Sequence, residues 1–307
     1  MRIWILALVL CACGKSSSEK KSDQPPAEDK QQDDKPKKQP AEAAFPGPKV
    51  SLPTPVAKLA LDLSEADAKA AAPDLFAAEY GWEVPEFEGL KINASIQEGR
   101  LYQIYVEIKQ PIDTVKAWLT KKWFAPRESK NSIGNPLLYF DSPDVGLRAV
   151  LESTASNSML RYYKVMSLEQ LLGKDKQWGF EKTPLLGTSQ DDLMKTYAEY
   201  HPTPRPDDPS SIALSLPALP TSEYGNHVSV RVKNGKVTGY TLEINSGGDA
   251  ATDAAILSRL EAMFGKGKVD SMGQYTDFAG PQKAKAEIRK TDAASFAHTV
   301  WVGDYKK

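Results

Sequence analysis

The chain of 307 residues has few cysteines and no excess of charge of either sign, and both facts exclude classes of protein. Its two cysteines, Cys11 and Cys13, lie in the first thirteen residues, so the rest of the chain offers no disulfide, thiol nucleophile or thiolate metal ligand. Lysine and arginine number 39 against 40 aspartate and glutamate, whereas nucleic-acid-binding proteins usually carry a marked basic excess. We therefore expect no nucleic-acid partner.

Long apolar runs are also scarce. The run Ile3–Leu10 follows one positive charge, Arg2, and is shorter than the roughly 20 residues needed to span a bilayer. A short apolar run behind a basic residue is typical of a secretion signal. We assign residues 1–12 to a signal peptide, and 41% hydrophobic with 26% charged residues fits a soluble protein beyond it.

The end of this segment resembles the bacterial lipobox. In Leu10-Cys11-Ala12-Cys13 a leucine stands three residues before a cysteine, and small residues lie between them. The resemblance implies cleavage after Ala12 and covalent attachment of fatty acids such as palmitate to Cys13, which would hold the protein in a membrane. Gly14 follows the cysteine instead of an aspartate, which in Gram-negative lipoproteins implies the outer membrane, on either its periplasmic or its outer side. An ordinary signal peptide is the alternative.

Residues 13–55 have the composition of a tether. Eight of the 22 prolines lie between Gly14 and Pro55, and Phe45 is the only aromatic residue there. So little apolar surface cannot offset the entropy of ordering a chain. Basic and acidic residues nearly balance, which argues against a polybasic membrane-binding segment. We therefore expect a lipidated cysteine followed by a disordered linker.

Residues 56–307 contain an internal duplication with a spacing of 136 residues. Each copy has two stretches in which apolar residues alternate with polar ones, joined by a short turn, Glu98-Gly99 in the first copy and Asn234-Gly235 in the second. This pattern predicts a β-hairpin. The alternating residues are Ile92, Ala94, Ile96, Ile104, Val106 and Ile108, matched by Val228, Val230, Val232, Tyr240, Leu242 and Ile244.

Helices are predicted on both sides of each hairpin. Ser64 and Ser189 are suited to cap a helix that precedes the hairpin. Apolar residues recur every four positions behind it, and two further strands follow. We predict an α+β fold of two tandem related modules, 56–172 and 173–307, each ordered helix, β-hairpin, helix and two further antiparallel strands. The apolar stripes are Val115, Leu119 and Trp123 in one copy and Ile256, Leu260 and Phe264 in the other.

The three histidines do not form a catalytic or metal-binding pattern. His227 and His298 fall at or within predicted strands, where a structural role is favoured. His201 precedes Asp207 and Asp208, but that spacing matches no metal motif. We expect no metal and no cofactor.

Carboxylates offer one alternative. Glu107 and Glu243 occupy equivalent strand positions in the two copies and could meet as a pair, although their place opposite the apolar face favours exposure to solvent. The chain has no Gly-x-Ser-x-Gly nucleophile motif and no phosphate-binding glycine loop before a helix. We therefore name no catalytic residue and expect a protein that is not an enzyme.

Aromatic residues suggest where a partner would bind. Trp82, Tyr105 and Trp178 lie in or beside loops and strand ends, and such side chains are enriched in binding interfaces. Trp123 and Phe124 are instead assigned to the core.

One further resemblance concerns a helix start. Gly187–Leu193, with the sequence GTSQDDL, is similar to the helix start of small outer-membrane lipoproteins that assist β-barrel assembly. The order of elements departs from that fold, because a helix is predicted between the hairpin and the later strands. No partner residue is carried over.

These observations predict a lipid-anchored, non-enzymatic protein of the cell envelope that binds a partner protein, an envelope polymer or a small ligand. Two alternatives stay open. One is an envelope hydrolase that uses Glu107, Glu243 or the region of His201, and the other is a structural surface module without a specific ligand.

Overall fold

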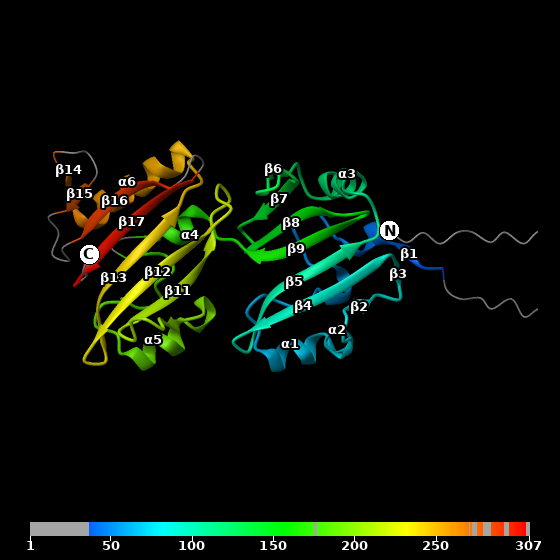
Figure 1. Ribbon diagram of the computed structural model, residues 1–307, viewed down its shortest axis with the longest axis horizontal. Coiled ribbons are helices and arrows are strands. Elements are labelled where there is room, and N and C mark those ends of the chain that lie inside the picture. The colour runs from blue at the N-terminus through cyan, green and yellow to red at the C-terminus, as the bar shows by residue number, and fades with distance from the viewer. Residues whose placement is uncertain are drawn as a thin grey trace, which may run out of the picture. The chain divides into compact units, whose positions relative to one another are not determined.

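The computed structural model describes residues 37–174, 177–269, 271, 275–278, 284–291 and 295–304 (Figure 1). The predicted signal peptide, the lipobox and Cys13 lie outside these residues. Residues Lys38–Lys307 make up one compact unit.

The first half of this unit is built on an antiparallel sheet of seven described strands, in the spatial order β2-β4-β5-β9-β8-β7-β6 (Figure 1). Helices α1 (Glu65–Ala71) and α2 (Pro73–Ala77) precede its central hairpin, and α3 (Ile112–Lys122) follows it. The strands are β2 (Trp82–Glu83), β4 (Leu90–Gln97), β5 (Arg100–Ile108), β6 (Arg127–Lys130), β7 (Pro136–Ser142), β8 (Leu147–Thr154) and β9 (Asn157–Lys164).

The second half repeats this order. Its described residues form an eight-stranded antiparallel sheet, β10-β11-β12-β13-β17-β16-β15-β14, in which the last six strands follow the connectivity of β4 to β6 in the first sheet. Its helices are α4 (Leu168–Leu172), α5 (Gln190–Thr196) and α6 (Ala250–Phe264). The strands are β10 (Thr203–Pro204), β11 (Ser211–Ala218), β12 (Gly225–Lys233), β13 (Lys236–Asn245), β14 (Gly267–Val269), β15 (Tyr275–Phe278), β16 (Lys285–Thr291) and β17 (Ser295–Gly303).

Both predicted hairpins are confirmed. Strand β4 pairs with β5 and β12 pairs with β13, each antiparallel. The turn residues Glu98, Gly99, Asn234 and Gly235 all have positive φ, as two-residue hairpin turns require. The alternation therefore identified the strands and the turn together.

The predicted helix caps are confirmed as well. Ser64 accepts a hydrogen bond from the amide of Asp67, and Ser189 accepts one from the amide of Asp192, both at 3.1 Å. These bonds satisfy amides that have no partner within the helix. Gly265 ends α6 with φ +84.

Each half has its own hydrophobic core. In the first, Ile104, Val106 and Ile108 of β5 pack with Val115 and Leu119 of α3. In the second, the equivalent strand residues pack with the apolar stripe of α6. The two halves join where β9 ends: Val165 forms a bridge with Ala218 of β11, and the Met166 amide donates to its carbonyl at 3.0 Å.

The predicted α+β class is wrong, because strands dominate the described residues. Four strands follow α3 in the first half and α6 in the second, where two were predicted. Strands β10 and β11 precede the hairpin of the second half, where no strand was predicted. Strand β6 reads Arg-Glu-Ser-Lys and has no apolar residue to reveal it, and the prolines around β11 concealed its alternation. Strand β6 lies at the edge of its sheet and buries none of its side chains, so its sequence carries little periodic signal.

The predicted boundary of the disordered linker at residue 55 is also wrong for its described part. Strand β1 (Gln39–Pro40) pairs in parallel with β3 (Phe87–Glu88). The Phe45 ring packs 5.2 Å from Trp118 and is buried in the first core, and the Trp123 indole donates to the Pro46 carbonyl at 2.8 Å. A few apolar residues were enough to order a proline-rich segment, because α3 offered them an aromatic surface.

Candidate functional site

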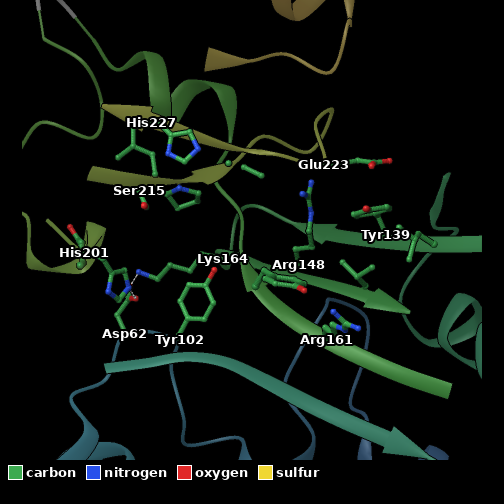
Figure 2. A pocket seen from close by; sticks show the side chains of 18 of the residues that line it. Asp62, Tyr102, Tyr139, Arg148, Arg161, Lys164, His201, Ser215, Glu223 and His227 are labelled. Carbon is green, nitrogen blue, oxygen red and sulfur yellow. Dashed lines mark ion pairs between the residues drawn. The ribbon is translucent and has the colours of Figure 1, made fainter. Parts of the chain in front are cut away.

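A cavity of about 450 Å³ lies between the outer face of the first sheet and the strands β11 and β12 of the second (Figure 2). Its size falls in the range of small-molecule sites, roughly 300 to 1,000 Å³. Tyr102, Lys164 and Asp62 line one side, and Ser215 and His227 line the other.

Strand alternation decides which side chains of the first half reach the cavity. In β9, Leu160 and Tyr162 are buried in the core, so Arg161 and Tyr163 project from the opposite face. The residues directly opposite Arg161 on the neighbouring strands, and those opposite them in turn, form a row across the same face of the sheet. The row reads Tyr105, Arg161, Val150, Tyr139 and Arg127.

Tyr139 lies between two guanidinium groups. The Arg127 guanidinium carbon is 4.3 Å from the ring centroid, and that of Arg148 is 5.2 Å away, both within cation–π range. Burial is the main cause that raises the pKa of Tyr139 to about 12, and Glu223 adds to it. The phenol is therefore protonated at neutral pH and can donate a hydrogen bond.

The charged side chains of the cavity wall are joined in ion pairs. Each of the five cations at the wall or just behind it contacts a carboxylate, and each of the five carboxylates contacts a cation, so the pairs carry no net charge. The pairs are Arg127–Glu223, Arg148–Asp141, Arg161–Glu152, Lys164–Asp62 and Lys182–Glu199.

Arg148 connects the two halves at one end of the cavity. Its side chain is 3% exposed and donates to the Ser222 and Leu219 carbonyls, each at 2.8 Å, and to Asp141 at 2.5 Å. A buried guanidinium with this many partners is positioned rigidly. Arg127 adds a 3.2 Å bond to the Pro220 carbonyl beside it.

His201 connects the halves at the other end. Its Nε2 lies 3.4 Å from Asp62, its Nδ1 lies 3.8 Å from Glu98, and its ring meets the Tyr102 ring edge to face at 6.1 Å (Figure 2). Burial lowers the pKa of His201, and Glu98 opposes that shift. Thr203 also donates to Glu98, at 3.2 Å. The histidine is thus held mainly neutral at pH 7, with its ring fixed in the cavity wall.

Lys164 lies in the cavity wall beside Asp62. Its ammonium contacts the Asp62 carboxylate, and burial lowers its pKa. It also lines a second cavity of about 670 Å³, together with Glu199 and Pro217, which are shared by both. The second cavity has a more apolar wall, formed in part by Leu52, Leu59 and other residues of the segment before α1.

Three further side chains stand in a row on the second sheet. Ser215 of β11 pairs with His227 of β12, and His227 pairs with Glu243 of β13. All three side chains are exposed. A serine, a histidine and a carboxylate in this order are the components of a nucleophilic triad.

The two carboxylates that the sequence suggested as a pair lie apart in the structure. Glu107 lies in the first sheet, where Asn157 donates to it at 2.8 Å, whereas Glu243 lies in the second. The two carboxylates therefore belong to different sheets and are not neighbours within either. His298 is buried, and its Nε2 lies 2.5 Å from Asp253, which fits the predicted structural role.

Asp208, which follows His201 in the sequence, accepts hydrogen bonds from the hydroxyl and amide of Ser210, at 2.5 and 3.1 Å. Across the described residues, no three His, Cys, Asp or Glu side chains gather as a metal site would require.

Of the aromatic candidates, Trp178 is wrong as a partner-binding residue. It is 1% exposed in the second core, and its indole donates to the Tyr240 hydroxyl at 3.0 Å. Trp82 is half-buried and packs against the first core. Tyr105 belongs to the outer row, where Arg161 lies 6.0 Å from its ring, next to the cavity.

No sequence pattern indicates Asp62, Arg161 or Lys164 as residues of the candidate site. None belongs to a motif, and they meet only because the sheet brings β9 beside the segment before α1. Tyr102 gave a signal, as an aromatic residue on the exposed face of a predicted strand.

Comparison with known proteins finds no matching family model, no matching curated protein and no matching solved structure. None of the helices in the described part of the chain has the length and apolar character needed to cross a bilayer.

Proposed function

We propose that the protein is a lipid-anchored, non-enzymatic binding protein of the cell envelope, and that the cavity between its two halves holds the ligand. The observation that carries this proposal is the cavity itself. It combines the exposed ring of Tyr102 and the more buried rings of Tyr139 and Tyr163 with ion-paired side chains, held in place at both ends by Arg148 and His201. Concave sites with a few well-positioned polar groups are typical of ligand binding.

The lipid anchor rests on the lipobox resemblance at Cys13, which implies attachment to a membrane. Basic and acidic residues nearly balance, 39 against 40, so the chain has no basic excess that would attract it to an anionic membrane surface. This balance supports an anchor that relies on lipid. The outer membrane is the proposed location because Gly14 follows the cysteine.

Native mass spectrometry of the full chain, purified from its own membranes, tests the cavity. We expect a non-covalent adduct on the wild type and its loss from Ser215→Trp, because Ser215 lines the cavity and an indole would fill it. Ser229→Trp is the matched control, since Ser229 lies on the same face of the second sheet but outside the cavity wall. An adduct that survives Ser215→Trp, or no adduct on the wild type, contradicts the proposal.

A hydrolase is the second candidate, and the row of Ser215, His227 and Glu243 favours it. A serine-reactive phosphonate probe separates the two, because it labels only a serine that a neighbouring base activates. We expect no labelling of the wild type. Labelling that disappears in Ser215→Ala identifies an enzyme and contradicts the binding proposal.

A further inference from the structure

The ion pairs around the cavity restrict the charge of its ligand. Three cations and four carboxylates line the wall, and each is paired. With the partners behind the wall, Arg127, Lys182 and Asp141, the five pairs carry no net charge. A ligand with net charge would therefore lose its hydration shell on entry without meeting an uncompensated opposite charge, which is unfavourable. Paired charges still donate and accept strong hydrogen bonds. The cavity suits a ligand that has no net charge but many hydrogen-bonding groups.

Tyrosine rings add a second requirement. Tyr102 is 45% exposed at the cavity, with its ring edge held against His201 (Figure 2). Tyr139 and Tyr163 line the same wall. A tyrosine offers an apolar ring face and a polar hydroxyl in one rigid side chain. The pyranose rings of carbohydrates present a C–H face that packs on such rings and hydroxyls that bind the surrounding polar groups.

Asp62 provides independent support, because its backbone is unfavourable for an aspartate. Its φ is +82, in the left-handed region that favours glycine. The duplication supplies the comparison. The Asp62 amide donates to the Leu101 carbonyl at 2.8 Å, and the Gly187 amide donates to the equivalent carbonyl of Val237 at 2.8 Å, with φ +86.

The backbone conformation at position 187 favours glycine, whereas the space around it would accommodate a side chain. An added Cβ would meet nothing within 4 Å. The first half therefore keeps a strained aspartate where the second half has the residue that the backbone prefers. Strain of this kind is concentrated at functional sites. The Asp62 carboxylate contacts Lys164 and His201 in the cavity wall, so its function lies there.

We propose that the ligand is a neutral carbohydrate, with one sugar ring packed on Tyr102 and its hydroxyls bound by Asp62, Lys164 and His201. This inference rests on the proposed function, because it identifies the ligand of the same cavity. The Asp62 carboxylate accepts from a sugar hydroxyl, and the Lys164 ammonium donates to one. Asp62 and Tyr102 are thus the binding residues that determine specificity.

Isothermal titration of the full chain tests the proposal. The protein is purified in a polyoxyethylene detergent, since maltoside detergents carry sugar head groups. The probes are hexasaccharides of α-1,4-glucose, β-1,4-glucose and β-1,4-N-acetylglucosamine, with hexagalacturonate as the charged comparison. We expect saturable binding of at least one neutral hexasaccharide and weaker binding of hexagalacturonate.

Variants then locate the site. Asp62→Gly removes the carboxylate while relaxing the backbone, and Tyr102→Ala removes the ring. Each should weaken binding at least about tenfold, the equivalent of about 1.4 kcal/mol. Tyr80→Ala is the control, because Tyr80 is an exposed tyrosine that does not line the cavity. It should leave binding unchanged.

Two results overturn the carbohydrate assignment: tighter binding of hexagalacturonate than of every neutral hexasaccharide, or wild-type affinity in both Asp62→Gly and Tyr102→Ala. Absence of binding to all the neutral hexasaccharides also contradicts it. If the adduct that Ser215→Trp removes is still found in that case, the cavity is a binding site for another class of ligand and the proposed function stands.

Discussion

Replacing Asp62 separates the energy of its backbone from that of its carboxylate. Asp62→Gly and Asp62→Ala both remove the contacts with Lys164 and His201 and differ only in tolerance of φ +82. We expect the glycine variant to be more stable by about 1 kcal/mol, because a Cβ is strained in the left-handed region. Urea unfolding measures the difference. Equal stability, or a more stable alanine variant, would show that the backbone at this position is not strained.

The half-buried carboxyl group of Glu181 makes the stability of the protein depend on pH. Burial raises its pKa from 4.5 to about 7, although the amides of Leu185 and Trp178 donate to it. The folded state therefore binds this proton more tightly than the unfolded state. Its contribution to stability is complete below pH 4.5 and is lost as the pH rises through 7.

The comparison of wild type with Glu181→Gln tests this sign, because the other titrating groups cancel between the two proteins. Between pH 5 and pH 8 the wild type should lose more free energy of unfolding than the variant. Carbon-13 chemical shifts of the carboxyl group should show its titration near pH 7. A carboxyl that titrates near 4.5, or equal pH dependence in both proteins, contradicts the expectation.

At the scale of elements, Arg148 of β8 holds the segment between β11 and β12 against the first sheet. Arg148→Met leaves Asp141 and the carbonyls of Leu219 and Ser222 without this donor, and breaking a buried pair costs about 3–5 kcal/mol. Arg161→Met is the control, since that side chain is 40% exposed and its pair with Glu152 is worth at most about 1 kcal/mol. Urea unfolding of both variants measures the contrast. Similar losses would show that Arg148 does not connect the halves.

The elements that could be predicted are those with a local pattern. The turn Asn234-Gly235 between alternating strands and the serine caps before α1 and α5 follow from a few adjacent residues. Strand β6 and the segment around Phe45 could not be predicted, because each is ordered by residues distant in sequence. The candidate site is the part of the molecule that local sequence patterns predict least. Asp62, Lys164 and His201 come from three separate segments and share no motif.

At the scale of the whole molecule, the two halves keep one strand order but have diverged in what they contribute. The first sheet supplies the tyrosines and most of the charges, and the second supplies the strands that face them. Paired positions show the divergence directly: Tyr162 opposite Ile104 corresponds to Val302 opposite Tyr240, which places Asp304 where the first half has Lys164. With Gly187 in place of Asp62, the second half has no counterpart of the Asp62–Lys164 pair.

The lipobox resemblance predicts that Cys13 decides the position of the whole molecule in the cell. If lipid on Cys13 is the anchor, Cys13→Ala should move the protein from the membrane fraction to the soluble fraction. Cys11→Ala is the matched control, because the lipobox resemblance implies that Cys11 is removed with the signal peptide. Immunoblots of separated fractions read the outcome, and Cys13→Ala protein that stays with the membranes means that another feature of the chain attaches it.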